Sequence, residues 1–98
     1  MAFKIEIERL AEEEFLEAVL YYEMQRSGLG NDLILCYEEA LATIIRNPFF
    51  EVRIENVRLY NIRRFPYQII YYIENESIFI IGFFNAHRDP IQWQNRIK

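Results

Sequence analysis

The chain begins with a short alternation of apolar and polar residues. Residues 3–7, with the sequence FKIEI, carry an apolar side chain at every second position. This period of two is typical of a strand that buries one face and exposes the other. We therefore expect a first strand over residues 3–7.

Two helices are predicted next. Between Glu8 and about Arg26 the apolar residues recur at steps of four and three, the spacing of an amphipathic helix. The sequence SGLG at residues 27–30 supplies two glycines able to adopt positive φ and end this helix. The same spacing then continues up to the sequence RNP at residues 46–48. The second helix is expected to fold back on the first.

The second half of the chain is rich in β-branched and aromatic residues. These residues form the segments VRLYNIRRF, QIIYYI and IFIIGFF, at residues 57–65, 68–73 and 78–84, separated by Pro66 and by the turn sequence ENES. Such segments predict three strands in two successive hairpins. The expected order is β-α-α-β-β-β, an α+β fold with a two-helix hairpin on one face of a mostly antiparallel four-stranded sheet.

The segments 68–73 and 78–84 are apolar on both faces. A two-helix hairpin covers only one face of a sheet, so the second face needs another cover. We consider a bound protein, a second copy of the chain, or the C-terminal sequence DPIQWQNR, which includes Ile91 and Trp93. The alternation alone does not assign the aromatic residues of these strands to either face; they include Tyr71, Tyr72, Phe79 and Phe83.

Length and composition restrict the class of protein. A chain of 98 residues forms a single domain, taken as residues 1–98. Cys36 is the only cysteine, which excludes an intramolecular disulfide and a cysteine-based metal site. The N-terminus lacks the apolar core of a signal peptide, and the longest apolar run is too short to span a membrane. We expect a soluble cytoplasmic protein without a metal or cofactor.

Charge is unevenly distributed along the chain. The net charge is −4, which argues against a general nucleic-acid coat. Residues 1–45 hold ten acidic and three basic residues, whereas residues 46–98 hold eight basic and five acidic residues. Seven of the nine arginines lie in the second half, where they either bind an anionic partner or pair with nearby glutamates such as Glu51, Glu55 and Glu74.

Candidate chemistry is sparse. No glycine-rich phosphate loop, histidine or cysteine ligand pair, or serine nucleophile motif occurs. The one histidine, His87, follows the last predicted strand beside Asn85, Arg88 and Asp89. Such a histidine is either a surface hydrogen-bonding residue or a general acid or base.

Cleavage of RNA through its 2′-hydroxyl requires a base, an acid and cations that stabilise the phosphorane. Arginine, tyrosine and histidine supply these groups where they cluster. The candidates would converge if the second and fourth predicted strands end on the same side of the sheet; they are Arg58, Arg63, Arg64, Tyr67, His87 and Arg88.

Several sequence features together resemble the RelE/ParE superfamily of toxins from bacterial toxin–antitoxin modules, also called plasmid-stabilisation proteins. They are the element order, YYEMQRSGLGNDL between the helices, NP after the second helix, RRFPYQIIYYI and RDPIQWQNR, and they cover residues 3–96. The resemblance implies a compact toxin encoded beside an antitoxin that wraps around it. Such an antitoxin would supply the missing cover on the sheet.

The family divides by target. RelE-like members cut mRNA on the ribosome, whereas ParE-like members inhibit DNA gyrase without being enzymes. Two departures weaken the nuclease interpretation: Gln68 stands where many relatives have arginine, and Asn85 stands where many have histidine. A net charge of −4 also fits RNA phosphates poorly.

We therefore interpret the chain as a ParE-like toxin that inhibits a protein target such as DNA gyrase and is neutralised by an antitoxin. The residues expected to bind antitoxin and target are Arg58, Arg63, Arg64, Asn85, His87, Arg88 and Trp93. Two alternatives stay open. One is a ribosome-dependent endoribonuclease that uses Arg63, Arg64, Tyr67, His87 or Arg88; the other is a non-toxic member that binds only an antitoxin or a second copy of itself.

Overall fold

A computed structural model describes residues 3–50 and 52–87. For residues 53 and 54 it describes the backbone alone. Strand β1 (Lys4–Ile7) is followed by helices α1 (Arg9–Gln25) and α2 (Leu29–Arg46). The strands β2 (Val52–Ile54), β3 (Val57–Asn61), β4 (Tyr67–Glu74) and β5 (Ser77–Asn85) complete the order. The predicted α+β order is confirmed, and β2 adds a three-residue strand that the sequence did not predict.

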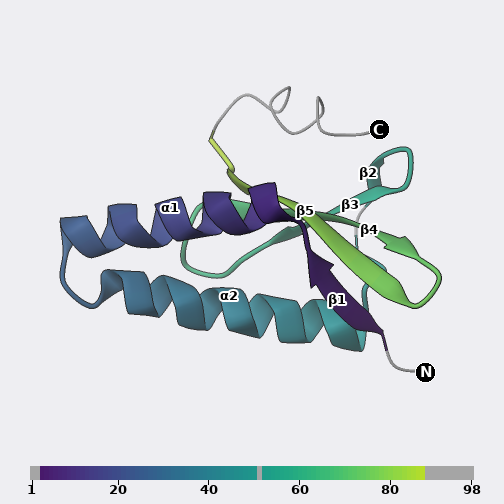
Figure 1. The fold of residues 1–98 in the computed structure, drawn as a ribbon, viewed down its shortest axis with the longest axis horizontal. Helices are drawn as coiled ribbons and strands as arrows, with labels where there is room; N and C mark the ends of the chain where they lie inside the picture. Colours follow the sequence, from purple (N-terminus) through teal and green to yellow (C-terminus); the bar gives the residue numbers. More distant parts are fainter. Residues whose placement is uncertain (1–2, 51, 88–98) are drawn as a thin grey trace.

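The strands form one sheet in the order β1-β5-β4-β3-β2. Strand β1 pairs with β5 in parallel, a pairing that requires a long connection between the two strands and not a tight turn. The remaining neighbours are antiparallel, as expected for hairpins. Figure 1 shows the two helices lying together on one face of this sheet.

The turn between the helices depends on one glycine conformation and one close approach. Gly28 has φ of 90°, a left-handed conformation that glycine adopts without strain. Gly30 lies inside α2, and a Cβ atom there would come within 2.8 Å of the Val19 carbonyl oxygen. The expectation that both glycines supply positive φ was therefore wrong for Gly30, which instead allows α2 to approach α1.

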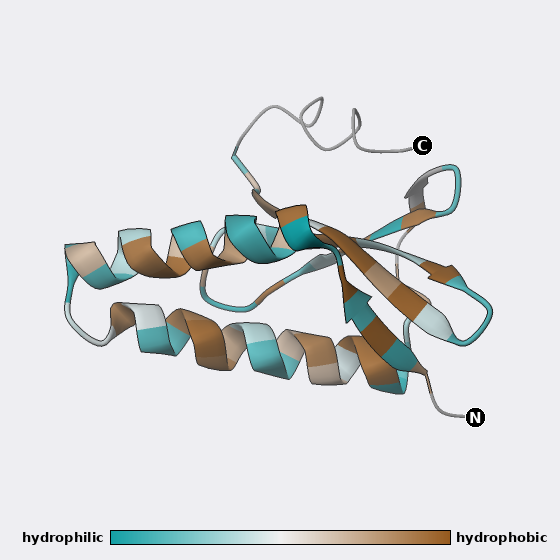
Figure 2. Ribbon diagram, in the orientation of Figure 1, coloured by the Kyte–Doolittle hydropathy of each residue, from teal (hydrophilic) through white to brown (hydrophobic). Residues whose placement is uncertain are grey.

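The main hydrophobic core lies between the helices and the sheet. Its centre is aromatic: Phe15 of α1 stacks on Tyr37 of α2 with ring centroids 3.9 Å apart, and Phe83 of β5 meets both rings edge-on. Tyr67 of β4 stacks on the other side of Phe83 at 4.6 Å. Figure 2 shows hydrophobic residues recurring along both helices and along the two central strands. These contacts fix how the helix hairpin sits on the sheet.

The opposite face of the sheet carries a second apolar cluster. It contains Val57, Leu59, Ile70, Ile81 and Phe84, each at most 7% exposed. These five positions are thus buried in the single chain and do not form the large open patch that the sequence suggested. The expected cover by the C-terminal sequence 89–96 lies outside the described residues.

The two faces of the central strands can now be assigned. Tyr71 and Phe83 face the helices, whereas Tyr72 and Phe79 stack on each other beside the second cluster, with centroids 5.0 Å apart. Ile70 pairs with Gly82 and Tyr71 pairs with Ile80, so Ile81 is an extra residue in β5. The alternation of β5 side chains between the two faces therefore shifts by one residue after Ile81. This β-bulge returns Phe83 to the helix side.

Candidate functional site

The topology brings the start of β4 and the end of β5 to the same end of the sheet. Tyr67 pairs with Asn85, and the Ala86 N–H donates a hydrogen bond of 2.7 Å to the Pro66 carbonyl. The end of β3 lies beside them, since Asn61 pairs with Gln68. The segments 61–68 and 85–87 therefore form a common surface at this end, which we call the sheet-end surface. It contains most of the predicted site residues that the structure describes.

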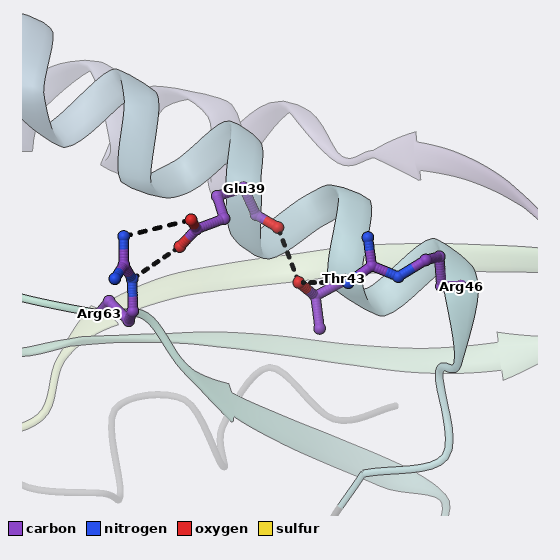
Figure 3. Close-up of polar contacts among 4 residues, drawn as sticks. All are labelled: Glu39, Thr43, Arg46 and Arg63. Atoms are coloured by element: carbon purple, nitrogen blue, oxygen red, sulfur yellow. Dashed lines mark hydrogen bonds and ion pairs between the residues drawn. The ribbon is translucent and has the colours of Figure 1, made fainter.

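Arg63 extends from the β3–β4 loop to helix α2. Its Nε atom donates to Glu39 Oε1 at 2.8 Å and its Nη2 atom to Glu39 Oε2 at 3.2 Å, a two-point contact. Figure 3 shows this pair, with Thr43 further along α2 donating its hydroxyl to the Glu39 carbonyl oxygen. Both charged side chains are mostly exposed. The guanidinium is thereby oriented by α2.

Arg64 makes a second contact with the same helix. Its Nη2 atom lies 3.0 Å from Asp32 Oδ2, and its guanidinium lies 5.4 Å from the centre of the Phe65 ring. Exposed ion pairs of this kind stabilise a protein by only about 0–1 kcal/mol, so an anionic ligand displaces them at small cost. The two ion pairs thus orient the arginine side chains but hold them only weakly.

The sequence analysis missed the partners of these arginines. Asp32 and Glu39 are seven residues apart on α2 and therefore lie on the same side of the helix, two turns apart. That spacing was readable from the sequence. The sequence did not show how α2 is rotated about its axis, and this rotation turns the Asp32 and Glu39 side toward the β3–β4 loop.

The loop itself is anchored by Phe65. This side chain is buried and meets the Tyr22 ring edge-on at 5.0 Å. Two short backbone hydrogen bonds, Phe65 N–H to Arg63 O and Tyr67 N–H to Phe65 O, each 2.8 Å, tighten the chain on either side. Arg64 occupies a positive φ of 75° between them. The buried aromatic ring thus positions the two exposed arginines.

Tyr67 lies at the edge of the main core and is partly exposed. Its half-buried ring stacks on Phe83 and lies 6.2 Å from the Tyr22 ring. Burial raises the pKa of the Tyr22 hydroxyl, with smaller contributions from Tyr67 and Tyr21. The Tyr22 hydroxyl is therefore neutral at physiological pH and able to donate a hydrogen bond.

Asn85 and His87 form a turn after β5. The Asn85 Oδ1 atom accepts a hydrogen bond of 2.8 Å from the His87 N–H, which fixes the direction of the chain. The His87 side chain is exposed beyond this turn. Arg88 and Trp93, the other two predicted binding residues in this part of the sequence, lie outside the described residues.

Arg58 lies away from the sheet-end surface. It pairs with Tyr71 in the middle of β4, three residues before Asn61 on β3, which places it about 10 Å along the strand. Its Nη1 atom donates to the Phe50 carbonyl at 2.7 Å, and its guanidinium lies 5.4 Å from the centre of the Phe49 ring. Arg58 therefore holds down the connection between α2 and β2, and the predicted convergence of all the arginines was wrong on this point.

Tyr71 reinforces the same connection from inside the core. Its hydroxyl donates a hydrogen bond of 2.8 Å to the Pro48 carbonyl. Burial raises the pKa of this hydroxyl, although a backbone hydrogen bond at Phe50 and the charge of Arg58 act in the opposite direction. Arg58 and Tyr71 therefore both hold the connection between α2 and β2 against the sheet.

Gln68 interacts within the sheet. Its Nε2 atom donates a hydrogen bond of 3.1 Å to Asn61 Oδ1 on the neighbouring strand. Gln68, which stands where the sequence resemblance implied an arginine, thus forms a neutral cross-strand pair. Across the residues that the structure describes, no group of acidic, histidine or cysteine side chains is arranged to hold a metal ion, and no helix is long and apolar enough to cross a membrane.

The fold of this chain is similar to that of a known protein. No protein-family model matches the chain, and no curated protein matches it. A solved structure of the chromosomal ParDE TA system from P. aeruginosa contains a similar chain, with a TM-score of 0.67 and 11% sequence identity. The superposition covers 87% of this chain and 97% of that one. This chain has a RelE/ParE-like fold.

The RelE/ParE-like fold extends over nearly the whole of the compared domain, so the resemblance seen in the sequence is confirmed for the architecture. At 11% identity the likeness concerns the backbone and not the residues of a site. The sheet-end surface of this chain therefore has to be interpreted from its own side chains.

Proposed function

We propose that this chain is the toxin of a type II toxin–antitoxin module, of the ParE kind. It would inhibit an essential protein target such as DNA gyrase and be neutralised by an antitoxin encoded beside it. The observation that supports this most directly is the match of the fold to a component of a ParDE toxin–antitoxin system over most of both chains.

Electrostatics support a protein target over RNA. A protein that binds RNA or DNA phosphates does so mainly through unpaired Lys and Arg. In this chain Glu39 and Asp32 lie beside Arg63 and Arg64 and offset their positive charge, and the whole chain carries a net charge of −4. The sheet-end surface is better suited to specific contacts with carboxylates and backbone carbonyls of a folded partner.

A ribosome-dependent endoribonuclease is the second candidate. It is favoured by one observation, that the segments carrying Arg63, Arg64, Tyr67 and His87 meet at one end of the sheet. Against it stand Gln68, which is neutral, and Arg58, which is engaged elsewhere.

DNA supercoiling by purified gyrase tests the proposal in vitro. We expect the purified chain to inhibit supercoiling, and the product of the adjacent gene to relieve the inhibition. The double variant Arg63→Ala/Arg64→Ala should weaken inhibition by about tenfold, because two arginines that contact the target are lost. Arg9→Ala, which removes an exposed arginine from α1, is the matched control and should inhibit as the wild type does.

Full supercoiling activity in the presence of the wild-type chain would contradict the gyrase assignment. Ribosome-dependent cutting of mRNA by the same preparation would then identify the chain as the nuclease. Inactivity in both assays, together with binding to the adjacent gene's product or to a second copy, would identify a non-toxic family member.

A further inference from the structure

Helix α2 places two carboxylates beside the sheet-end surface. Two of its three acidic residues lie against the two arginines of the β3–β4 loop. Glu39 binds Arg63 at two points, at 2.8 and 3.2 Å, as Figure 3 shows, and Asp32 Oδ2 lies 3.0 Å from Arg64 Nη2. Seven residues span about 10 Å along a helix, so the two contacts lie near each other on the surface. Each arginine of the surface therefore has a negative charge next to it.

Stability gives little reason for these two contacts. All four charged side chains are between 35% and 74% exposed, and exposed ion pairs stabilise a fold only slightly. The β3–β4 loop is positioned by the buried Phe65 ring, which meets the Tyr22 ring edge-on. The main effect of the two carboxylates is therefore on the charge that the loop presents to a ligand.

Without these carboxylates the surface would suit a strand of RNA. The loop arginines would be open to phosphates, and Tyr67 and His87, at the same end of the sheet, offer rings on which bases stack. RNA affinity rises with the number of phosphates that cations neutralise. A carboxylate beside each arginine opposes this twice: the ion pair has to be broken, and the released carboxylate then repels the phosphate.

Uncharged acceptors are not excluded in this way. A guanidinium has five N–H groups, so one that binds a carboxylate at two points keeps donors for the carbonyl and amide oxygens of a folded protein. A nucleic-acid strand, in contrast, carries a charge at every phosphate. An unfavourable charge placed against a competitor is one of the two ways in which a protein selects its partner.

We propose that Asp32 and Glu39 are specificity-determining residues of the sheet-end surface, which exclude RNA from it and leave it to a protein partner. The choice of a protein target rests on the proposed function, whereas the exclusion of RNA is measurable by itself. The two carboxylates of α2 thus decide between the two kinds of target that the loop arginines are able to bind.

Binding of a fluorescein-labelled single-stranded RNA of about 12 nucleotides tests the exclusion. The variant Asp32→Asn/Glu39→Gln removes both charges and keeps the size of both side chains. We expect it to bind this RNA about tenfold more tightly than the wild type, because both arginines become available to phosphates. The slope of log K against log salt should steepen by about 1.4, since two more phosphates are neutralised at about 0.7 each. Fluorescence anisotropy between about 50 and 200 mM salt measures both quantities.

Glu13→Gln/Glu17→Gln is the matched control. It removes two negative charges from exposed positions of α1 and releases Arg9 from Glu13, so the net charge changes by the same amount. Its RNA affinity should stay within about threefold of the wild type, with an unchanged salt slope. Equal gains in the two double variants would overturn the proposal, because net charge would then be the cause. An α2 variant that binds RNA as the wild type does, while circular dichroism shows it folded, would also overturn it.

Two further sets of variants locate the effect. Arg63→Ala/Arg64→Ala, added to the α2 variant, should return the RNA affinity to about that of the wild type. Added affinity that persists without these arginines would overturn the proposal, because the RNA would then bind elsewhere. Asp32→Asn and Glu39→Gln alone should each gain about threefold, which keeps the test valid if the double variant does not fold.

The supercoiling assay, run on the same proteins, separates this proposal from the proposed function. If the wild type inhibits gyrase and only the α2 variant gains RNA affinity, both stand. If the α2 variant gains RNA affinity but the wild type leaves gyrase active, the exclusion of RNA stands and the gyrase assignment fails. If the wild type inhibits gyrase but the α2 variant gains no RNA affinity, the exclusion fails and the toxin proposal remains. A wild type that binds the RNA as tightly as the α2 variant would overturn the exclusion and favour the nuclease.

Discussion

Tyr37 lies where the helix hairpin meets the sheet. Its ring stacks on the Phe15 ring and meets the Phe83 ring edge-on, and the residue is 5% exposed. Burial raises the pKa of its hydroxyl to about 12, with a smaller contribution from the charge of Glu12. The neutral hydroxyl is therefore favoured by the folded state.

The raised pKa of Tyr37 predicts a loss of stability in alkali. An unfolded tyrosine ionises near pH 10, so the contribution to the free energy of unfolding is fully present below that pH. It is lost between pH 10 and about 12, and amounts to roughly 2–3 kcal/mol. Urea unfolding of wild type and Tyr37→Phe at pH 9 and pH 11.5 measures it: the variant should lose less stability over this interval.

The comparison at pH 9 is the control, because the hydroxyl is protonated in both folded and unfolded chains there. Any difference between wild type and variant at pH 9 reports packing and hydrogen bonding alone. If the free energy of unfolding of the two proteins changed equally between pH 9 and pH 11.5, ionisation of Tyr37 would not be the cause of the loss of stability.

At the scale of elements, the two helices are joined by a contact that crosses their turn. The Glu23 carboxylate of α1 accepts hydrogen bonds from the Gly28 N–H at 3.1 Å and from the Gly30 N–H at 3.0 Å. These N–H groups belong to the start of α2, which lacks a capping side chain of its own. A residue of one helix therefore caps the next.

Removing this cap should destabilise the chain. We expect Glu23→Ala to lower the free energy of unfolding by about 1–2 kcal/mol, because the N-terminal N–H groups of α2 lose a charged acceptor. Glu23→Gln keeps one acceptor oxygen and should cost less. Glu17→Ala, at an exposed position of the same helix, is the matched control for the loss of a negative charge. Thermal unfolding of the four proteins measures the effect, and equal midpoints for Glu23→Ala and Glu17→Ala would contradict it.

The elements themselves could be predicted from the sequence, but their faces could not. Hydrophobic spacing located both helices and the strands β1, β3, β4 and β5, since each is long or strongly patterned. The strand β2 was missed because three residues carry too little pattern. The bulge at Ile81 was missed because an apolar run gives no signal for a change of phase; there the Phe83 N–H is taken up by the Glu14 carboxylate of α1, at 3.1 Å.

At the scale of the whole molecule, strand order decides which candidate residues meet. The antiparallel β3-β4-β5 arrangement brings Arg63, Arg64, Tyr67 and His87 to one end, as the sequence allowed but could not establish. Arg58 was grouped with them wrongly because a linear sequence does not show how far along β3 it lies. The acidic partners on α2 depend on how the hairpin is rotated against the sheet, which is a property of the packed core.

The division of charge between the two halves of the chain also acquires a structural meaning. The acidic first half forms the helices, and the basic second half forms most of the sheet. Where the halves meet, Asp32 and Glu39 pair with Arg64 and Arg63. The charge asymmetry of the sequence thus becomes a contact between α2 and the β3–β4 loop.

The central claim is that this chain is a ParE-like toxin, and induction of its gene alone in a bacterial culture tests it most directly. Growth, DNA-damage signalling and mRNA integrity are followed in the same samples, beside a culture that also produces the adjacent gene's product. We predict growth arrest with damage signalling and intact mRNA, and relief of the arrest by that product. Arrest with cut mRNA and no damage signalling, or unimpaired growth with abundant folded protein, would contradict the account.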